Sequence, residues 1–416
     1  MSSKPEVLAP AGSPESLRAA VRTGADAVYL GASRFSARAG AKNFGPEELR
    51  EAVRYCHARG VRVYLTVNTL LTDGELPEAL DLVQYACSLP VDALLVQDMG
   101  LARELFRCAP EMPLHASTQT GVHTAAGARA LADAGFRRVV LARELNLEEI
   151  AQIRAKTPPA LELEVFVHGS MCVSFSGRCL LSNYLTGRDA NRGDCAQPCR
   201  WSYSLMEEKR PGEYFPVVEN GRGTFVLNSK DLCMIRHIPE LAAAGADSLK
   251  IEGRAKSAYY VAVTTNAYRR AIDEYRRDPK APLSPWVAEE LNKISHREYT
   301  TGFYFGSPGQ VYENGGYVRD YEVAAVCTGW ENGMAVLSQR NRFFRGDTVD
   351  VLEPGEIPFP FPLEEIFDEN MEPISSAPHA TMTVLARCPR PLKTGALLRR
   401  AIIPEPSGKN PQEKGA

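Results

Sequence analysis

Four of the chain's ten cysteines stand close together in the sequence, at Cys172, Cys179, Cys195 and Cys199. Four thiolates are the ligand set of a closed tetrahedral zinc site or of an iron–sulfur cluster. Structural zinc sites commonly use cysteine pairs separated by about two to four residues, and only Cys195 and Cys199 have that spacing here. The pattern therefore predicts a metal centre, and its spacing favours an iron–sulfur cluster over zinc.

The composition limits where such a centre operates. The N-terminus has no apolar run of the kind found in signal peptides, and no stretch reaches the roughly 18 uninterrupted apolar residues of a membrane span. We therefore expect a cytoplasmic protein without a membrane partner, in a reducing compartment where clustered cysteines are more often ligands or redox groups than disulfides. The net charge of −3 gives no overall basic field, so a nucleic acid would need a local positive patch.

The elements that must position the cysteines are repeated pairs of a short apolar run and an amphipathic segment, as in parallel strands joined by helices. The expected strands are 6–12, 26–32, 61–68, 92–98, 113–119, 137–145, 161–169 and 247–254. They predict an α/β fold, a (β/α)8 TIM-like barrel over residues 1–285 that carries the cysteine segment 170–203 as an insertion. A further candidate strand at 224–232 leaves the strand count open, and an open doubly wound sheet is the alternative fold.

The character of the sequence changes after residue 285. We expect a linker over 286–317, followed by a second domain over 318–402. This second stretch consists of short alternating runs punctuated by Gly, Asn and Asp, which predict a small antiparallel β-barrel. The final residues, 403–416, have the composition of a disordered tail.

Polar residues at the carboxyl ends of the strands are the candidate site residues, because these strand ends meet at one mouth of such a barrel. The candidates for catalysis are His168, Glu144, Asp231 and Glu252, of which His168 ends a strand just before Cys172. The candidates for substrate binding are Asn68, Gln97, His115, Arg143, Lys250 and Arg254. For each of them the alternative is a solvated side chain or a salt bridge inside the barrel mouth.

Residues 164–201, EVFVHGSMCVSFSGRCLLSNYLTGRDANRGDCAQPCRW, resemble the collagenase-like peptidase family, number thirty-two of the peptidases of unknown catalytic type. The resemblance extends to LNSKDL, LKIEGR and SHREYTTGFYFG downstream and covers about residues 5 to 400, including the family's C-terminal β-barrel domain. It implies very different functions. Some members are named peptidases or collagenases, whereas others hydroxylate a wobble uridine of tRNA, a cytidine of ribosomal RNA or an intermediate of ubiquinone synthesis.

By its length and its CAQPCRW element the chain is most similar to the tRNA uridine branch of that family. The similarity implies a 4Fe–4S cluster on Cys172, Cys179, Cys195 and Cys199, with Cys233 as the competitor for the fourth ligand position. It also implies a cosubstrate, prephenate or a related small carboxylate.

A carboxylate needs cationic partners, and Arg143, Lys250 and Arg254 are the cations at the strand ends. A peptidase would instead need an activated nucleophile or an open metal site, and the sequence contains neither H-E-x-x-H nor G-x-S-x-G. We therefore predict an enzyme, an RNA hydroxylase that converts the tRNA wobble uridine to 5-hydroxyuridine, with tRNA or ribosomal RNA as its partner. The alternatives are a collagenase-like peptidase and a non-catalytic RNA-binding or assembly partner.

Overall fold

The structure is a computed structural model that divides into two compact units. The first unit contains Met1–Ala288 and His296–Tyr317, and the second contains Glu289–Ser295 and Val318–Ala416. The residues that the structure describes are 5–38, 40–172, 174–201, 219–220, 223–224, 229–309 and 317–402. The tail at 403–416, predicted to be disordered, lies outside the described residues.

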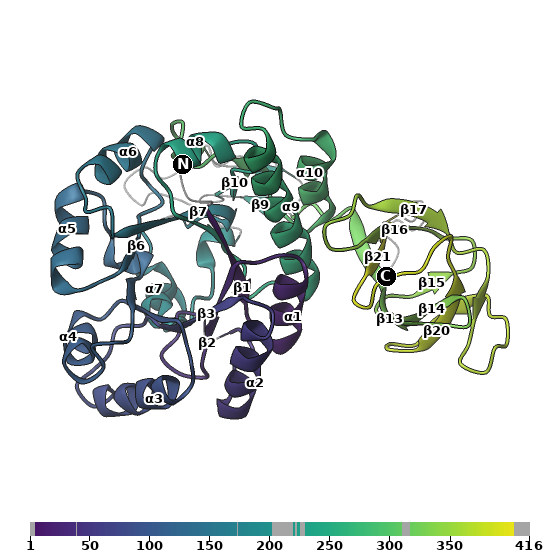
Figure 1. Ribbon diagram of the computed structural model, residues 1–416, viewed down its shortest axis with the longest axis horizontal. Coiled ribbons are helices and arrows are strands. Elements are labelled where there is room, and N and C mark those ends of the chain that lie inside the picture. Colours follow the sequence, from purple (N-terminus) through teal and green to yellow (C-terminus); the bar gives the residue numbers. More distant parts are fainter. Residues whose placement is uncertain are drawn as a thin grey trace, which may run out of the picture. The chain divides into compact units, whose positions relative to one another are not determined.

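Eight parallel strands form a closed barrel in the first unit (Figure 1). They are β1 (Glu6–Ala11), β2 (Ala27–Gly31), β3 (Arg62–Val67), β4 (Ala93–Val96), β5 (Leu114–Ala116), β6 (Arg138–Val140), β7 (Glu162–Ser170) and β11 (Ser248–Ile251). β11 pairs with β7 on one side and with β1 on the other, and this double pairing closes the sheet. Each strand coincides with a predicted segment, so the TIM-like fold class is confirmed.

Helices alternate with these strands and cover the outside of the barrel (Figure 1). They are α1 (Pro14–Arg22), α2 (Pro46–His57), α3 (Leu76–Ser88), α4 (Met99–Cys108), α5 (Ala125–Ala134), α6 (Leu147–Ala155), α8 (Ile238–Ala243) and α9 (Ala258–Arg277). Side-chain caps fix where several of them begin, because the hydroxyl of Ser13 and the carboxylate of Asp98 each accept a free backbone N–H of the first turn. No helix in the described parts of the chain is both long and apolar enough to cross a membrane.

The candidate strand at 224–232 does not belong to the barrel. Its end forms β10 (Asp231–Cys233), which pairs antiparallel with the carboxyl end of β7 and places Leu232 opposite Gly169. β12 (Tyr299–Thr300) then pairs with β10. Residues 225–228 lie outside the described residues. The extra strand therefore extends the sheet at the end of β7 and leaves the barrel with eight strands.

The segment 286–317, expected as a linker, contains regular structure. It carries most of α10 (Pro285–Glu290), all of η4 (Leu291–Lys293) and β12. Residues 296–317 belong to the first unit, where β12 joins the sheet, and residues 289–295 belong to the second unit. Glu290 is held there by Arg399, whose Nη2 lies 2.6 Å from its carboxylate.

The second unit is a curled antiparallel sheet of seven strands with a buried core. The strands are, in sheet order, β17 (Phe359–Pro362), β16 (Thr348–Leu352), β21 (Leu397–Ala401), β13 (Tyr321–Glu331), β14 (Met334–Gln339), β20 (Thr383–Arg387) and β18 (Ile366–Phe367). A separate pair, β15 (Phe343–Phe344) and β19 (Ser376–Ala377), places Phe343 in the core. Buried residues alternate with partly buried ones along β14, where Leu337 lies between Val336 and Ser338, as the period-two pattern predicted. The antiparallel C-terminal domain is confirmed.

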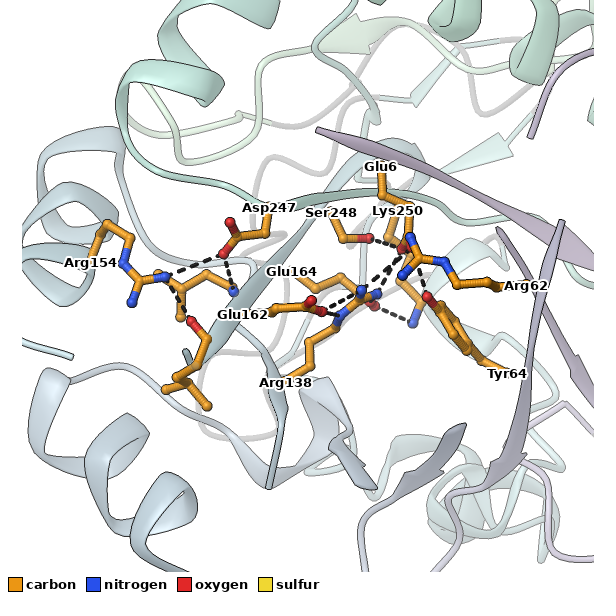
Figure 2. A network of polar contacts seen from close by, with 12 residues as sticks. Glu6, Arg62, Tyr64, Arg138, Arg154, Glu162, Glu164, Asp247, Ser248 and Lys250 are labelled. Atoms are coloured by element: carbon orange, nitrogen blue, oxygen red, sulfur yellow. Dashed lines mark hydrogen bonds and ion pairs between the residues drawn. The ribbon is translucent and has the colours of Figure 1, made fainter. Parts of the chain in front are cut away.

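Charged side chains fill the centre of the barrel in the first unit (Figure 2). Arg138 Nη1 donates to Glu6 Oε1 at 2.7 Å and to Glu164 Oε2 at 2.9 Å, and Lys250 Nζ donates to Glu164 Oε1 at 2.6 Å. Burial raises the pKa of Glu6, but Arg138, Arg62 and the Tyr64 hydroxyl together outweigh burial and hold that pKa below its ordinary value. Two buried carboxylates and two buried cations thus neutralise one another, and removing one of them would leave an uncompensated charge.

Candidate active site at the barrel mouth

The strand ends and the segment after β7 enclose a cavity of about 580 Å³ in the first unit. β2, β3, β7 and β11 contribute Tyr29, Thr66, Phe166 and Lys250 to its wall. The segment after β7 contributes the four cysteines predicted as ligands, Cys172, Cys179, Cys195 and Cys199. The structure therefore places all four cysteines at the barrel mouth, where enzymes of this fold carry their reacting groups.

The cysteine segment is held against the barrel by close backbone approaches. It contains α7 (Leu181–Thr186) and the short helices η2 (Ala190–Arg192) and η3 (Pro198–Arg200). Gly193 has φ +92°, and a Cβ at this position would lie 2.7 Å from the carbonyl oxygen of Ser36 in the loop after β2. Arg192 forms an ion pair with Glu75 before α3. Glycine at 193 is required both by the left-handed backbone and by this contact.

Cys172 has the electrostatic surroundings of a metal ligand. Its side chain is exposed to the cavity, yet protein atoms surround it closely enough that burial alone would raise its pKa. The guanidinium groups of Arg143 and Arg38 outweigh this effect, so the pKa of Cys172 lies below its ordinary value. The thiolate is the form of cysteine that binds metals, so these two arginines favour ligation.

The four cysteines share one cavity but are not arranged as a ligand set in this structure. Among the described residues, no group of three or more His, Cys, Asp or Glu side chains stands close enough together to bind a metal ion. Cys233, the competitor for the fourth position, lies on β10 outside the cavity lining, and burial raises its pKa to about 11. The geometry favours Cys199 over Cys233.

Three arginines near different strand ends reach the cavity: Arg38, Arg143 and Arg254. Arg143 Nη1 donates to the carbonyl of Ser170 at 3.0 Å. Arg254 donates from Nη1 to Thr66 at 2.9 Å and from Nη2 to Asn43 at 2.8 Å. Burial and the Arg38 charge lower the pKa of Arg254 to about 10, so it remains protonated at neutral pH. The three cations predicted to bind a carboxylate, Arg143, Lys250 and Arg254, therefore all line the cavity.

Glu252 is the predicted catalytic acid or base that the structure places in the cavity. Its carboxylate accepts a hydrogen bond from Arg38 Nε at 3.2 Å. Burial opposes its ionisation, but Arg38, Arg143 and Arg254 outweigh burial and lower its pKa. Glu252 is therefore an anion at neutral pH, able to accept a proton but not to donate one.

Asn68 also lines the cavity, as predicted for a substrate-binding residue. Its Oδ1 accepts from the backbone N–H of Ala37 at 3.1 Å, and its Nδ2 donates to Gln119 Oε1 at 3.3 Å. These bonds fix the orientation of two amide groups at the carboxyl ends of β3 and β5.

His168 does not reach the cavity. The pairing of β7 with β11 shifts register between Lys250 and Ile251, and His168 lies against the rings of Tyr260 and Tyr268 of α9, with centroids 5.9 and 5.6 Å away. Burial lowers the pKa of His168 to about 3, so its imidazole is neutral. The expectation of a proton-transfer group beside the cysteines therefore needs correction, because the strand turns this side chain toward the helix layer.

The remaining candidates also lie outside the cavity lining. Asp231 forms a buried ion pair with Arg297, whose Nη2 lies 2.7 Å from its carboxylate. His115 points into the barrel interior, where its ring meets Tyr64 edge-on at 4.8 Å and burial lowers its pKa. Gln97 is buried at the end of β4, and Glu144 lies 3.9 Å from the His123 ring. Asp231 follows the alternative expectation of a salt bridge within the fold. Gln97 Oε1 and His115 Nδ1 are instead buried without a hydrogen-bond partner among the described residues.

Arg38 is the principal cavity residue that the sequence reasoning missed. It lies in the loop after β2, donates a hydrogen bond to Glu252, and helps to lower the pKa of Cys172. The signal was available, because a cation shortly after a barrel strand lies at the mouth by the same rule that identified Arg143. Arg38 lies in the loop, beyond the end of β2 at Gly31, and not at the strand end itself.

The closed barrel with a cysteine-lined mouth, followed by a separate antiparallel domain, defines the class to which this protein belongs. Residues 12–314 match the model of Peptidase family U32, and residues 319–399 match the model of the Peptidase family U32 C-terminal domain. The chain belongs to peptidase family U32.

Relatives within this family are named either for RNA modification or for proteolysis. The tRNA hydroxylation protein P1 of Bacillus subtilis (strain 168) is 35% identical over 404 residues, which cover 95% of each chain. A 23S rRNA 5-hydroxycytidine synthase of Escherichia coli (strain K12) is 40% identical over 313 residues, 74% of this chain and 46% of that one. A collagenase of Porphyromonas gingivalis is 34% identical over 318 residues, 72% of this chain and 73% of that one.

Proposed function

We propose that this protein hydroxylates a pyrimidine of RNA, and in particular converts the wobble uridine of tRNA to 5-hydroxyuridine. The observation that carries the proposal is a single cavity lined by four cysteines and by arginines near three strand ends. The chain that forms this cavity is related along nearly its whole length to a tRNA hydroxylation protein. Cysteine ligands suit redox chemistry on a base, and arginines suit anionic partners.

The cofactor that we propose is a 4Fe–4S cluster held by Cys172, Cys179, Cys195 and Cys199. The donor set fits such a cluster, since all four thiols line one cavity and the pKa of Cys172 is already lowered by neighbouring arginines. When bound, a cluster of this kind supplies one-electron transfer. The protein's own contribution is to keep the thiols at the barrel mouth and to surround them with positive charge.

The cosubstrate that we propose is a small carboxylate, prephenate or a related compound. Arg254 supports this, because its Nε is buried and has no hydrogen-bond partner among the described residues. A buried guanidinium N–H without an acceptor is costly, and a carboxylate entering the cavity would satisfy it. Lys250 contributes less free charge, since Glu164 already accepts its hydrogen bond at 2.6 Å.

The base that is modified must leave its stack to enter a barrel mouth. The amides of Asn68 and Gln119 face the cavity and offer both a donor and an acceptor to the edge of a uracil ring. Glu252 is the ionised carboxylate within the cavity, and we assign to it the acceptance of a proton from the base. His168, Glu144 and Asp231 have no part in this scheme, because they lie elsewhere in the fold.

A collagenase-like peptidase is the second candidate, and the named collagenase relative favours it. A cysteine peptidase needs a histidine beside its nucleophile. The described residues that line the cavity include no histidine, so such a pair is not assembled there. The redox function therefore has the stronger support from the site.

The two functions are separated by one set of variants purified without oxygen. Cys172→Ala and Cys199→Ala should lose iron, sulfide and hydroxylation together. Cys108→Ala, an exposed cysteine at the end of α4, is the matched control and should keep all three, and so should Cys233→Ala. Mass spectrometry of nucleosides from tRNA of cells lacking the protein, incubated with each variant, measures the reaction. Gelatin cleavage by cluster-free protein, or hydroxylation by the Cys172 variant, would overturn the proposal.

A further inference from the structure

The second unit carries an exposed loop that has no role in the function proposed for the cavity. Residues 340–345 follow β14, contain β15 and include Arg340, Arg342, Phe344 and Arg345, all of them exposed. Phe344 retains 42% of its accessible surface. We call this segment the arginine loop. Three exposed arginines within six residues, of which Arg342 lies over the Phe344 ring, form a local positive patch on a chain whose net charge is −3.

The cations of the arginine loop are not neutralised. Arg340 Nη1 donates to the hydroxyl of Ser338 at 2.9 Å, and Arg345 Nε donates to the carbonyl of Glu364 at 2.9 Å. The guanidinium carbon of Arg342 lies 4.8 Å from the centre of the Phe344 ring. Within the described residues, none of the three guanidinium groups forms a salt bridge with a carboxylate.

Cations elsewhere on the same sheet and its loops behave differently, and this contrast is informative. They pair with carboxylates of the same unit, namely Arg387 with Glu365, Arg390 with Glu353, Lys393 with Glu356, Arg399 with Asp350, and Arg400 with Glu322. Pairing is therefore usual on this sheet. The arginine loop departs from that pattern at three neighbouring positions, next to an apolar ring that gains nothing from facing water.

The backbone of the arginine loop is firmly anchored. Phe343 is fully buried in the core, while Phe344 pairs with Ser376 of β19. Asn341 Nδ2 donates to the carbonyl of Val323 at 2.7 Å, and the carbonyl of Arg342 accepts from Arg400 at 2.7 Å. A loop fixed in this way presents its side chains without a large ordering cost on binding.

We propose that the arginine loop is a docking surface for single-stranded or looped RNA. Guanidinium groups bind phosphate oxygens, and an exposed aromatic ring with an arginine above it offers a stacking platform to an unpaired base. The inference rests on the proposed function, because an RNA substrate is far larger than the base that enters the cavity. Its phosphates need partners beyond the barrel mouth.

Binding of an unmodified tRNA transcript to the full chain, measured over a series of salt concentrations, tests this surface. The double variant Arg340→Gln/Arg342→Gln should weaken binding about tenfold and lower the slope of log K against log salt by about 1.4 to 1.8, the loss of two phosphate contacts. Phe344→Ala should weaken binding about fivefold to a hundredfold with an unchanged slope, because stacking releases no counterions.

The matched control is Arg387→Gln/Lys393→Gln, which removes two exposed, paired cations from the same unit and changes the net charge by the same amount. It should leave the salt slope close to that of the wild type. The docking surface would be refuted if the two double variants lost the same amount of affinity for the transcript. It would also be refuted if polyglutamate competed with the transcript for the loop more effectively than unlabelled RNA does. All variants should melt like the wild type.

Turnover separates this inference from the proposed function. The loop variants should raise KM for tRNA and leave kcat at saturating tRNA unchanged, because they lie outside the barrel. If the wild type hydroxylates tRNA and the loop variants bind tRNA normally, the docking surface is refuted and the proposed function is kept. If the loop variants weaken tRNA binding but the wild type does not hydroxylate tRNA, the proposed function is refuted and the docking surface is kept.

Discussion

Two glycines of the cysteine segment provide a matched test of how the barrel holds the proposed ligands. Gly193 and Gly187 both have positive φ, +92° and +71°, so alanine strains the backbone by about 1–2 kcal/mol at either position. Their surroundings differ. A Cβ at Gly193 would lie 2.7 Å from the carbonyl oxygen of Ser36 and 3.0 Å from the carbonyl carbon of Ala37, whereas one at Gly187 has no neighbour within 4 Å.

Gly193→Ala should displace the segment, since the atoms it meets are backbone and cannot rotate away. The contact has to lengthen from 2.7 Å to the 3.4 Å at which ordinary van der Waals contact begins, two residues before Cys195. Loss of a group that positions a ligand typically costs about 10- to 100-fold in metal affinity, and we expect that loss for Gly193→Ala but not for Gly187→Ala.

The assay for this difference is the retention of iron and sulfide after anaerobic reconstitution and challenge with a chelator. A second measurement is independent of the cluster: in metal-free protein, the thiols of Gly193→Ala should react faster with a disulfide reagent, because the segment no longer rests on the loop after β2. Equal cluster retention and equal thiol reactivity in the two glycine variants would refute the reasoning.

Two further residues yield predictions. Arg254→Gln should raise the prephenate concentration for half-maximal hydroxylation about 30- to 150-fold, because losing a cation that binds a carboxylate costs about 2–3 kcal/mol, and an unchanged value would place the carboxylate elsewhere. His168→Ala should lower the free energy of unfolding in urea by about 3 kcal/mol and leave turnover per folded molecule unchanged, whereas a hundredfold fall in turnover at full stability would return His168 to the site. As the pH falls from 6.5 toward 3, the free energy of unfolding of the wild type should decrease by up to about 1.4 kcal/mol per pH unit. The reason is that His168 is protonated in the unfolded chain but stays neutral in the folded protein, where its pKa is about 3. His168→Phe should remove that part of the slope in urea unfolding at pH 7 and 5, and an unaltered slope would assign it to other groups.

The barrel and the position of the cysteines were predictable because both depend on local order along the chain. Each strand is a short apolar run with its own turn signals, and β7 leads directly into the segment that begins at Cys172. Because β7 ends at the mouth, the residues immediately after it must also lie at the mouth. The same logic placed Arg143 and Arg254 correctly, since each stands within a few residues of a strand end.

The failures share a different cause, which is dependence on partners distant in sequence. His168 turns away from the cavity because the register of β7 against β11 shifts beside it, and nothing in the sequence of either strand marks that shift. Asp231 is occupied by Arg297, a partner 66 positions along the chain. Periodicity assigns a residue to a strand, but the pairing of strands decides which face it occupies.

The distribution of charge along the barrel axis connects the fold to its proposed chemistry. In the centre, Arg138 and Lys250 are matched by Glu6 and Glu164, so this layer has little net charge with which to attract a ligand. At the mouth the balance is different, because Glu252 accepts from Arg38. Arg143 and Arg254, by contrast, form no salt bridge with a carboxylate of the described residues.

An excess of buried positive charge is unfavourable unless an anion enters, and we propose two kinds of anion for this cavity. Thiolates of the cysteine segment are the first, since Arg143 already lowers the pKa of Cys172. A carboxylate cosubstrate is the second, beside Arg254 with its unpaired Nε. A neutral peptide bond would satisfy neither cation, and this favours the proposed cluster and small anion over the cleavage of collagen.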